Sequence, residues 1–244
     1  MSSIKNKMKK FEIISGWGLY PRVKIHKKKP KTLKEIKSAI LSVPFIARGN
    51  GRSYGDSAIN KFNTIDMRNF NRFLSFNEKS GLLIAQSGVL LKDILNTFIP
   101  KGWFPPVTPG TKFVTLGGMV AADIHGKNHY KFGTFRKYIK WLEIINHKGK
   151  IIKCSREENQ ELFFWTIGGM GLTGIILNVA FFLKPIKTAW INQRKLVAKN
   201  IFETFDLFES NIKSTYAVAW IDCYSKGSSL GRSILMLGEH AKVE

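Results

Sequence analysis

The stretch of sequence that decides the fold reads ARGNGRSYGDSA, from Ala47 to Ala58. Three glycines occur in seven residues after an expected buried strand, and glycine adopts positive φ without steric cost. Such a backbone can turn consecutive N–H groups toward one anion, while Arg52 and Ser53 add a fixed positive charge and a hydroxyl donor. The segment favours a pyrophosphate site, with an ordinary glycine-rich turn as the alternative. Its spacing matches neither a Walker loop nor the GxGxxG of Rossmann folds.

A second glycine-rich segment reads PGTKFVTLGGMVAADIHGKNH, from Pro109 to His129. Gly117 and Gly118 stand where a helix is expected to begin, so we expect their N–H groups to be free for a phosphate. Two histidines and a lysine then follow within five residues, in the string HGKNH. The string lacks the glutamate of a zincin helix, so no metal site is expected. Ordinary surface histidines are the alternative.

A third segment reads GGMGLTGII, from Gly168 to Ile176. Four glycines in seven residues, between an expected helix and an apolar strand, indicate a backbone that passes close to something flat or bulky. Close helix–strand packing would explain this segment by itself. Three such segments in one chain are hard to explain as coincident tight turns, and together they predict a dinucleotide site.

The chain is strongly basic, with 39 Lys and Arg against 17 Asp and Glu and a net charge of +22. Such a balance favours polyanionic partners, namely nucleic acid, anionic lipid or phosphorylated substrates, with a solvated basic surface as the alternative. The sequence has no zinc-finger spacing and no RNP-like strand, so a nucleic-acid partner is not expected. The longest apolar stretch, Gly174–Leu183, is too short to cross a bilayer, which predicts a soluble or peripherally attached protein.

Short helices and strands are expected in alternation around these segments, which predicts an α+β protein. Thr32 and Glu35 form a capping box at the start of one expected helix. We expect helices at 32–43, 90–98, 115–122, 159–166 and 201–208, and strands at 44–47, 63–67, 82–85, 141–146, 151–154, 174–183, 189–197, 216–224 and 232–237. Pro185 is expected to end both a strand and the first domain.

Together the three segments resemble the FAD-linked oxidases of the vanillyl-alcohol oxidase type, whose flavin domain is called PCMH-type. Within that family they look closest to the decaprenylphosphoryl-ribose oxidase group, which serves cell-envelope biosynthesis. The strings DIHGKNH and ELFFWTIGGMGLTGII are the specific ones, whereas GNGRSYGD indicates only the wider family. The likeness covers almost all of the chain after about residue 15.

The resemblance implies an α+β fold with a two-subdomain PCMH-type FAD-binding domain, followed by the beginning of an α+β cap or substrate domain. The expected bounds are a basic N-terminal segment at 1–14, the FAD-binding domain at 15–186 and an incomplete cap at 187–244. Family members return from the cap to the flavin domain and use a late lysine and tyrosine. Because the sequence ends at Glu244, we expect a truncated product, a split subunit or a partial chain.

The resemblance also implies site residues. His125, Lys127 and Tyr54 fall where family members face substrate and are the candidate catalytic residues. Many members attach FAD covalently through a histidine at the position of Arg52, and arginine cannot form that bond, so noncovalent FAD is expected. The implied cofactor-binding residues are Ala47, Arg48, Gly49, Asn50, Gly51, Arg52, Ser53, Tyr54, Gly55, Asp56, Ser57, Gly110, Thr115, Leu116, Gly117, Gly118, Ala122, Asp123, Ile124, His125 and Ile176.

The implied activity is FAD-dependent oxidation of a CH–OH group of a sugar or polyprenyl-phosphate sugar, by hydride transfer to the flavin. The alternatives are an aldonolactone oxidase of the same fold, a truncated FAD-binding protein without independent activity, and a nonenzymatic basic protein that binds nucleic acid. Expected partners are a sugar or lipid-linked sugar-phosphate substrate and a partner reductase. The expected location is cytoplasmic, with peripheral attachment at the inner membrane as an option.

Overall fold

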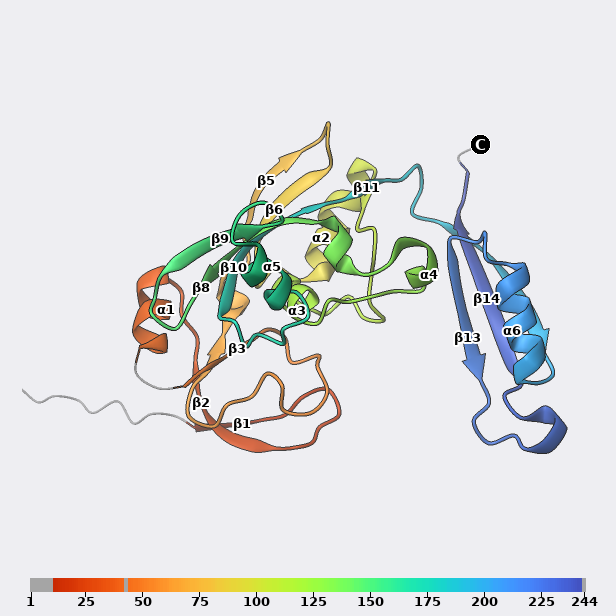
Figure 1. The fold of residues 1–244 in the computed structure, drawn as a ribbon, viewed down its shortest axis with the longest axis horizontal. Helices are drawn as coiled ribbons and strands as arrows, with labels where there is room; N and C mark the ends of the chain where they lie inside the picture. The colour runs from red at the N-terminus through yellow and green to blue at the C-terminus, as the bar shows by residue number, and fades with distance from the viewer. Residues whose placement is uncertain (1–10, 42–43, 243–244) are drawn as a thin grey trace, which may run out of the picture.

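The computed structural model describes residues 11–41 and 44–242, which form a large body and a smaller one beside it (Figure 1). The α+β class expected from the sequence is confirmed. A four-stranded sheet at one end of the large body has the order β1-β2-β4-β3. Its strands are β1 (Phe11–Ile14), β2 (Val23–Lys28), β3 (Ile46–Arg48) and β4 (Thr64–Asp66).

The centre of the large body is a five-stranded antiparallel sheet with the order β5-β6-β10-β8-β9. Its strands are β5 (Phe73–Asn77), β6 (Leu82–Gln86), β8 (Ile139–Ile145), β9 (Ile151–Ser155) and β10 (Ile175–Phe182). Strand β10 is hydrogen-bonded to β6 on one side and to β8 on the other. Six of the eight residues of β10 are buried, Ile175 among them. This burial explains why the sequence of the strand is almost continuously apolar.

Both hydrophobic cores of the large body contain residues of β10. Ile176 belongs to the cluster that joins the sheet to helices α2 (Leu91–Phe98), α3 (Leu116–Ala121) and α5 (Gln160–Thr166). Ile175 and Leu177 belong to the second cluster, with β4 and helix α1 (Leu33–Ile40). Because successive strand residues point to opposite faces, β10 packs against a core on each side.

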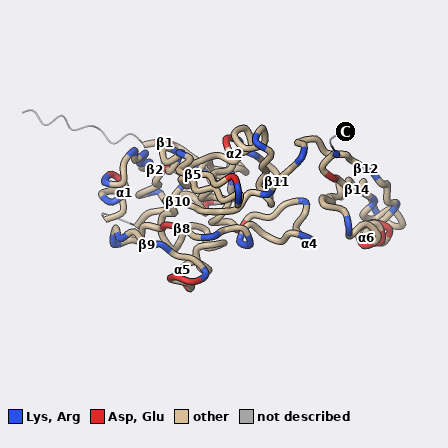
Figure 2. Tube along the Cα trace, turned by 90° about the horizontal axis from the view of Figure 1, so that it is seen from above, with Lys and Arg blue, Asp and Glu red and all other residues tan. Residues whose placement is uncertain are grey.

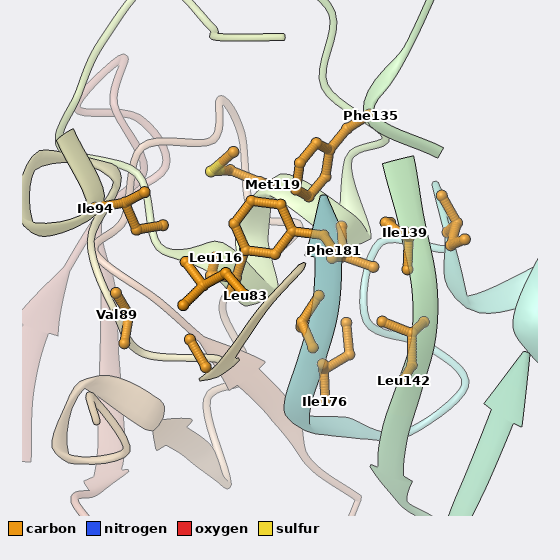
Figure 3. Packing of buried hydrophobic residues seen from close by; sticks show 14 of the residues in the cluster. Leu83, Val89, Ile94, Leu116, Met119, Phe135, Ile139, Leu142, Ile176 and Phe181 are labelled. Atoms are coloured by element: carbon orange, nitrogen blue, oxygen red, sulfur yellow. The ribbon is translucent and has the colours of Figure 1, made fainter. Parts of the chain in front are cut away.

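The first cluster fixes α3 over the sheet (Figure 3). Phe181 and Phe135 are fully buried and meet edge to face, with ring centroids 5.2 Å apart. Leu116 and Met119 of α3 are fully buried in the same cluster. This packing sets the position of α3, whose first turn faces the glycine-rich segments.

The expected capping box of α1 is present in modified form. Thr32 Oγ1 accepts a hydrogen bond from the N–H of Glu35 at 3.2 Å, as a helix cap does. The Glu35 carboxylate accepts from the N–H of Lys31 at 2.7 Å, one residue before the cap. The helix ends at Ile40, and the last two expected positions, 42 and 43, lie outside the described residues.

Some expectations for individual elements are wrong. Pro185 is the last residue of a strand as expected, but that strand is the short β11 (Lys184–Pro185), which pairs with β7 (Trp103–Phe104), and not β10. The strand expected at 216–224 ends at Ile221. Strands β1, β2 and β5 were not expected, because their polar and exposed residues do not alternate clearly. Of the expected N-terminal segment, 1–10 lies outside the described residues and Phe11–Ile14 is an edge strand of the first sheet.

The smaller body is a three-stranded sheet with one helix on it (Figure 1). Strands β12 (Ile191–Ala198), β13 (Tyr216–Ile221) and β14 (Ser233–His240) have the order β12-β14-β13, and α6 (Ile201–Ser210) packs against β12 and β14. The smaller body meets the larger beside α4 (His129–Phe132), where the N–H of Ala217 donates to the Lys127 carbonyl at 2.8 Å.

Replacing Phe181 with Ala should lower the free energy of unfolding by about 3–5 kcal/mol, because a fully buried ring is lost from the cluster that holds α3. Phe62→Ala is the matched control, since this ring is 58% exposed and its loss should change stability by no more than about 0.5 kcal/mol. Urea unfolding followed by circular dichroism measures both. Equal losses in the two variants would contradict the described core.

Candidate functional site

The three glycine-rich segments meet around one cavity of about 570 Å³ in the large body, a volume typical of a ligand site. Most residues implied by the resemblance to bind the cofactor line it: Ala47, Arg48, Gly49, Asn50, Gly51, Arg52, Ser53, Tyr54, Ser57, Gly110, Thr115, Gly117, Gly118, Ala122, Ile124 and Ile176. The other implied residues, Gly55, Asp56, Leu116, Asp123 and His125, are not among those that line it.

The loop after β3 offers its backbone to the cavity. Gly51 and Gly55 have φ of +66° and +61°, the left-handed values that glycine adopts most readily. Within the described residues, no backbone N–H from Asn50 to Ser57 donates a hydrogen bond to the protein. Residues 50–54 and Ser57 of this run line the cavity, and unpaired N–H groups along a cavity wall are a favourable environment for an anion.

Polar side chains hold this loop in place. Asn50 donates to the Phe113 carbonyl at 2.9 Å and accepts from Arg68 at 3.3 Å. Arg68 in turn pairs with Asp66, with 2.6 Å between nitrogen and oxygen. Burial alone would raise the pKa of Asp66, but the hydrogen bonds from Arg68 outweigh it and hold that pKa below its ordinary value. The loop is therefore tied through an ion pair to the end of β4.

The loop also packs closely on the start of α3. A Cβ on Gly49 would lie 2.1 Å from Thr115 Oγ1, so only glycine allows this approach. Thr115 Oγ1 accepts from the N–H of Gly118 at 3.3 Å and caps the helix. The N–H of Gly117 donates to the Ser87 carbonyl at 2.7 Å.

The expectation that the N–H groups of Gly117 and Gly118 are free for a phosphate is therefore wrong. The N–H of Gly118 donates to the side chain of the capping Thr115, and the N–H of Gly117 donates to the carbonyl of Ser87, the residue after β6. Both glycines still line the cavity, where they leave room next to the first loop. A Cβ on Gly117 would lie 2.8 Å from Ser87 Cβ, so glycine is needed there for packing.

The third segment is hydrogen-bonded to the last residues of α3 and forms part of the cavity wall there. The N–H of Gly168 donates to the Val120 carbonyl at 3.0 Å, and that of Met170 donates to the Ala121 carbonyl at 2.9 Å. Gly174 has a φ of +142°, and a Cβ there would lie 2.6 Å from the Ile145 carbonyl oxygen. These glycines thus serve close packing and also bring the chain to the cavity wall.

Three buried side-chain atoms on the lining residues have no hydrogen-bond partner among the described residues. They are Arg52 Nε, Ser57 Oγ and Ser87 Oγ. Buried polar atoms in native proteins are nearly always satisfied, so these three indicate a polar ligand. A cationic side chain and two hydroxyls beside unpaired N–H groups suit a diphosphate.

The HGKNH loop extends from the far wall of the cavity. Asp123 fixes its start, because its carboxylate accepts from the N–H of Arg136 at 2.9 Å and from Thr134 Oγ1 at 3.1 Å. The buried side chain of Asn128 donates to the Pro106 carbonyl at 2.9 Å. A Cβ on Gly126 would lie 2.5 Å from the Thr108 carbonyl oxygen, so the HGKNH loop makes a close backbone contact with the chain at Thr108.

The three candidate catalytic residues do not all line the cavity. Tyr54 does, with its side chain mostly exposed. His125 and Lys127 are exposed and follow Ile124, the last lining residue of that segment. The His125 and His129 rings meet edge to face, with centroids 5.4 Å apart. Within the described part of the chain, no group of three or more His, Cys, Asp or Glu could hold a metal ion.

Sequence reasoning missed several residues that line the cavity. Ser87 follows β6 and shows no motif, and only the register of β6 beside β10 brings it to the wall. Trp17 lies between β1 and β2, in a segment for which no structure was expected. Met67 was also missed, whereas the remaining lining residues belong to the three predicted segments without being among the implied cofactor-binding residues: Ala58, Pro109, Thr111, Val114, Ala121, Met170, Gly171 and Gly174.

Comparison with known proteins identifies the ligand class. Residues 29–155, just over half of the chain, match a family described as FAD binding domain. This match establishes FAD as the cofactor, and the unpaired donors of the cavity fit its diphosphate.

Individual relatives are oxidoreductases. The chain is 38% identical over 203 residues to decaprenylphosphoryl-beta-D-ribose oxidase of Mycolicibacterium smegmatis, covering 82% of this chain and 44% of that protein. It is 26% identical over 183 residues to a protein of Neurospora crassa assigned as a D-arabinono-1,4-lactone oxidase, covering 72% and 33%. It is 27% identical over 157 residues to cytokinin dehydrogenase 3 of Arabidopsis thaliana, covering 62% and 30%. The chain thus spans less than half the length of these relatives.

We predict that FAD is held noncovalently. Arg52 stands where the resemblance places the histidine of covalent attachment, and no histidine or cysteine is among the described residues that line the cavity. Acid precipitation of the FAD-loaded protein should leave all the flavin in the supernatant, as measured by its visible absorption. Flavin that stays with the precipitated polypeptide after washing would contradict the prediction.

Proposed function

We propose that this chain, which belongs to the FAD-binding domain family, oxidises a CH–OH group of a sugar or polyprenyl-phosphate sugar. The observation that carries the proposal is the cavity with unpaired N–H groups, next to the HGKNH loop, in which Arg52 Nε has no hydrogen-bond partner among the described residues. The 38% identity to decaprenylphosphoryl-beta-D-ribose oxidase supports this substrate class.

The roles of the residues follow from their positions. Bound FAD would supply the acceptor for the hydride of the carbinol carbon. His125 follows directly after a wall residue, and we assign it the task of orienting the substrate or relaying its hydroxyl proton. Tyr54, on the opposite segment of the wall, is assigned a substrate contact.

Lys127 is assigned to a phosphate on the substrate. Its side chain is exposed, and its carbonyl is hydrogen-bonded to β13 of the smaller body, which places it at the junction of the two bodies. Lys131 lies on the same segment and donates to the Lys213 carbonyl at 3.0 Å. A local excess of positive charge raises the concentration of an anionic substrate.

The charge of the whole chain is consistent with an anionic partner. Lys and Arg occur on both bodies, although none lies between Glu157 and Leu183, whereas Asp and Glu are fewer and stand out on α5 and α6 (Figure 2). We include peripheral attachment at an anionic inner membrane and a partner reductase in the proposal, with a cytoplasmic location. No helix within the described residues has both the length and the hydrophobicity needed to cross a bilayer.

The second candidate is an aldonolactone oxidase of the same fold, which the similarity to the Neurospora crassa protein favours. A third is an FAD-binding chain without activity of its own, because the relatives are more than twice as long as the matched stretch.

One experiment separates these candidates. The purified chain is loaded with FAD, and its visible spectrum is followed without oxygen after addition of a polyprenyl-phosphate ribose or a sugar lactone. Bleaching by the phosphate-linked sugar supports the leading proposal, and bleaching by the lactone alone supports the second. Bound flavin that neither sugar bleaches supports the third.

Replacing His125 with Ala should slow flavin reduction by about 10²–10⁴-fold, the usual contribution of a general acid or base, and leave the flavin spectrum of the bound cofactor unchanged. His147→Ala, in the exposed turn between β8 and β9, is the matched control. Stopped-flow absorbance measures both rates. A His125 variant that is reduced at the parent rate would refute the assigned role.

Replacing Lys127 with Met should raise the KM for a phosphate-linked sugar about fivefold, because an exposed ion pair contributes up to about 1 kcal/mol. The KM for a substrate without phosphate should not change. Lys148→Met, in the turn between β8 and β9, serves as the control for general charge. Equal changes with both substrates would argue against a phosphate contact.

A further inference from the structure

The segment between β1 and β2 lies against the cofactor loop, although it precedes the part of the chain that matches the FAD binding domain family. The N–H of Trp17 donates to the Ser53 carbonyl at 2.7 Å. Arg48 donates to the Ser15 carbonyl at 2.6 Å and to the Ala58 carbonyl at 3.3 Å, so it joins this segment to the far end of the loop. The two loops lie side by side below β3 (Figure 1).

The contact is closer than a side chain would allow. A Cβ on Gly16 would lie 2.5 Å from the Ser53 carbonyl oxygen and 2.6 Å from that of Gly55. Both neighbours are backbone atoms, which cannot move aside as the end of a flexible side chain can. Only glycine at position 16 therefore allows this segment to pack so closely against the cofactor loop.

Trp17 reaches from this segment into the cavity wall. Its ring lies 5.0 Å from the centre of the Arg52 guanidinium, and the Phe113 ring lies 5.9 Å from it on another segment. Among the described residues, Arg52 makes no ion pair with a carboxylate, and its buried Nε has no partner. Aromatic faces hold a cation without neutralising it, so Arg52 stays available for an anion in the cavity.

We propose that Ser15–Gly18 is a strap that retains FAD, in which Trp17 covers the cofactor loop and holds Arg52 toward the cofactor. The proposal rests on FAD as the cofactor of this cavity. Without a covalent bond, release of FAD is opposed by noncovalent contacts alone, and those of the strap add to the donors of the cofactor loop. Trp17 is 49% exposed, so it stands at the boundary of the cavity with solvent. It is a positioning residue that acts through Arg52.

The test measures how fast the full chain loses FAD. Loaded protein is diluted, and the flavin absorbance that remains after rapid desalting is followed with time. Trp17→Ala should release FAD about two- to fivefold faster, since a cation–π contact at an exposed site contributes about 0.5–1 kcal/mol. Trp17→Phe keeps a ring and should release FAD at a rate between those of the parent and Trp17→Ala.

Two further variants make the result specific. Gly16→Ala keeps Trp17, but its added Cβ prevents the strap from packing against the cofactor loop, so this variant should also release FAD faster. Trp190→Ala removes an 80% exposed tryptophan just before β12 and should release FAD at the parent rate. The unfolding midpoint of each apoprotein shows whether a variant still folds, and if Trp17→Ala does not, the phenylalanine and Gly16 variants decide.

Release at the parent rate from folded Trp17→Ala, or from both other strap variants, would overturn the proposal and leave the cofactor assignment intact. A parent chain that takes up no FAD would overturn both. The bound cofactor should also quench tryptophan emission less in Trp17→Phe than in the parent, and equal quenching in the two would show that Trp17 does not lie beside the bound cofactor.

Discussion

The structure of the large body depends on burial of β10 on both faces. One face packs under α3 through Ile176 and Phe181, and the other packs against α1 and β4 through Ile175 and Leu177. A strand in this position must be apolar along nearly its whole length, and its two cores must form together. The first sheet and the helices over the second sheet are therefore held at a fixed separation, and the cavity lies between them with Ile176 in its wall.

Close backbone approach then shapes the cavity. Gly49 against Thr115, Gly117 against Ser87 and Gly174 against Ile145 each place backbone where a Cβ would collide with a neighbour. The glycine pattern thus has two causes that sequence alone does not separate. In the first loop it exposes unpaired N–H groups, whereas at the start of α3 and before β10 it serves packing.

The sequence was sufficient for elements with strong local signals. The capped helix α1, the hairpin β8–β9 and the apolar strand β10 were predicted within a few residues, because each satisfies its pattern locally. Strands β1, β2 and β5 were not, since edge strands with polar residues take their conformation from their neighbours. The same limit applies to the site. The glycine-rich walls were evident, but Ser87 and Trp17 reach the cavity only through tertiary pairing.

The unpaired N–H groups from Asn50 to Ser57 have a consequence for how the protein responds to its surroundings. An amide N–H neither gains nor loses a proton under physiological conditions, unlike the imidazole of a histidine. The contribution of this loop to holding a diphosphate is thus insensitive to acidity. The amide contribution is equally independent of the side chains at those positions, whereas Asn50, Arg52 and Ser57 act through their side chains. Only the backbone share of diphosphate binding therefore survives substitution, as long as the glycines that allow the conformation persist.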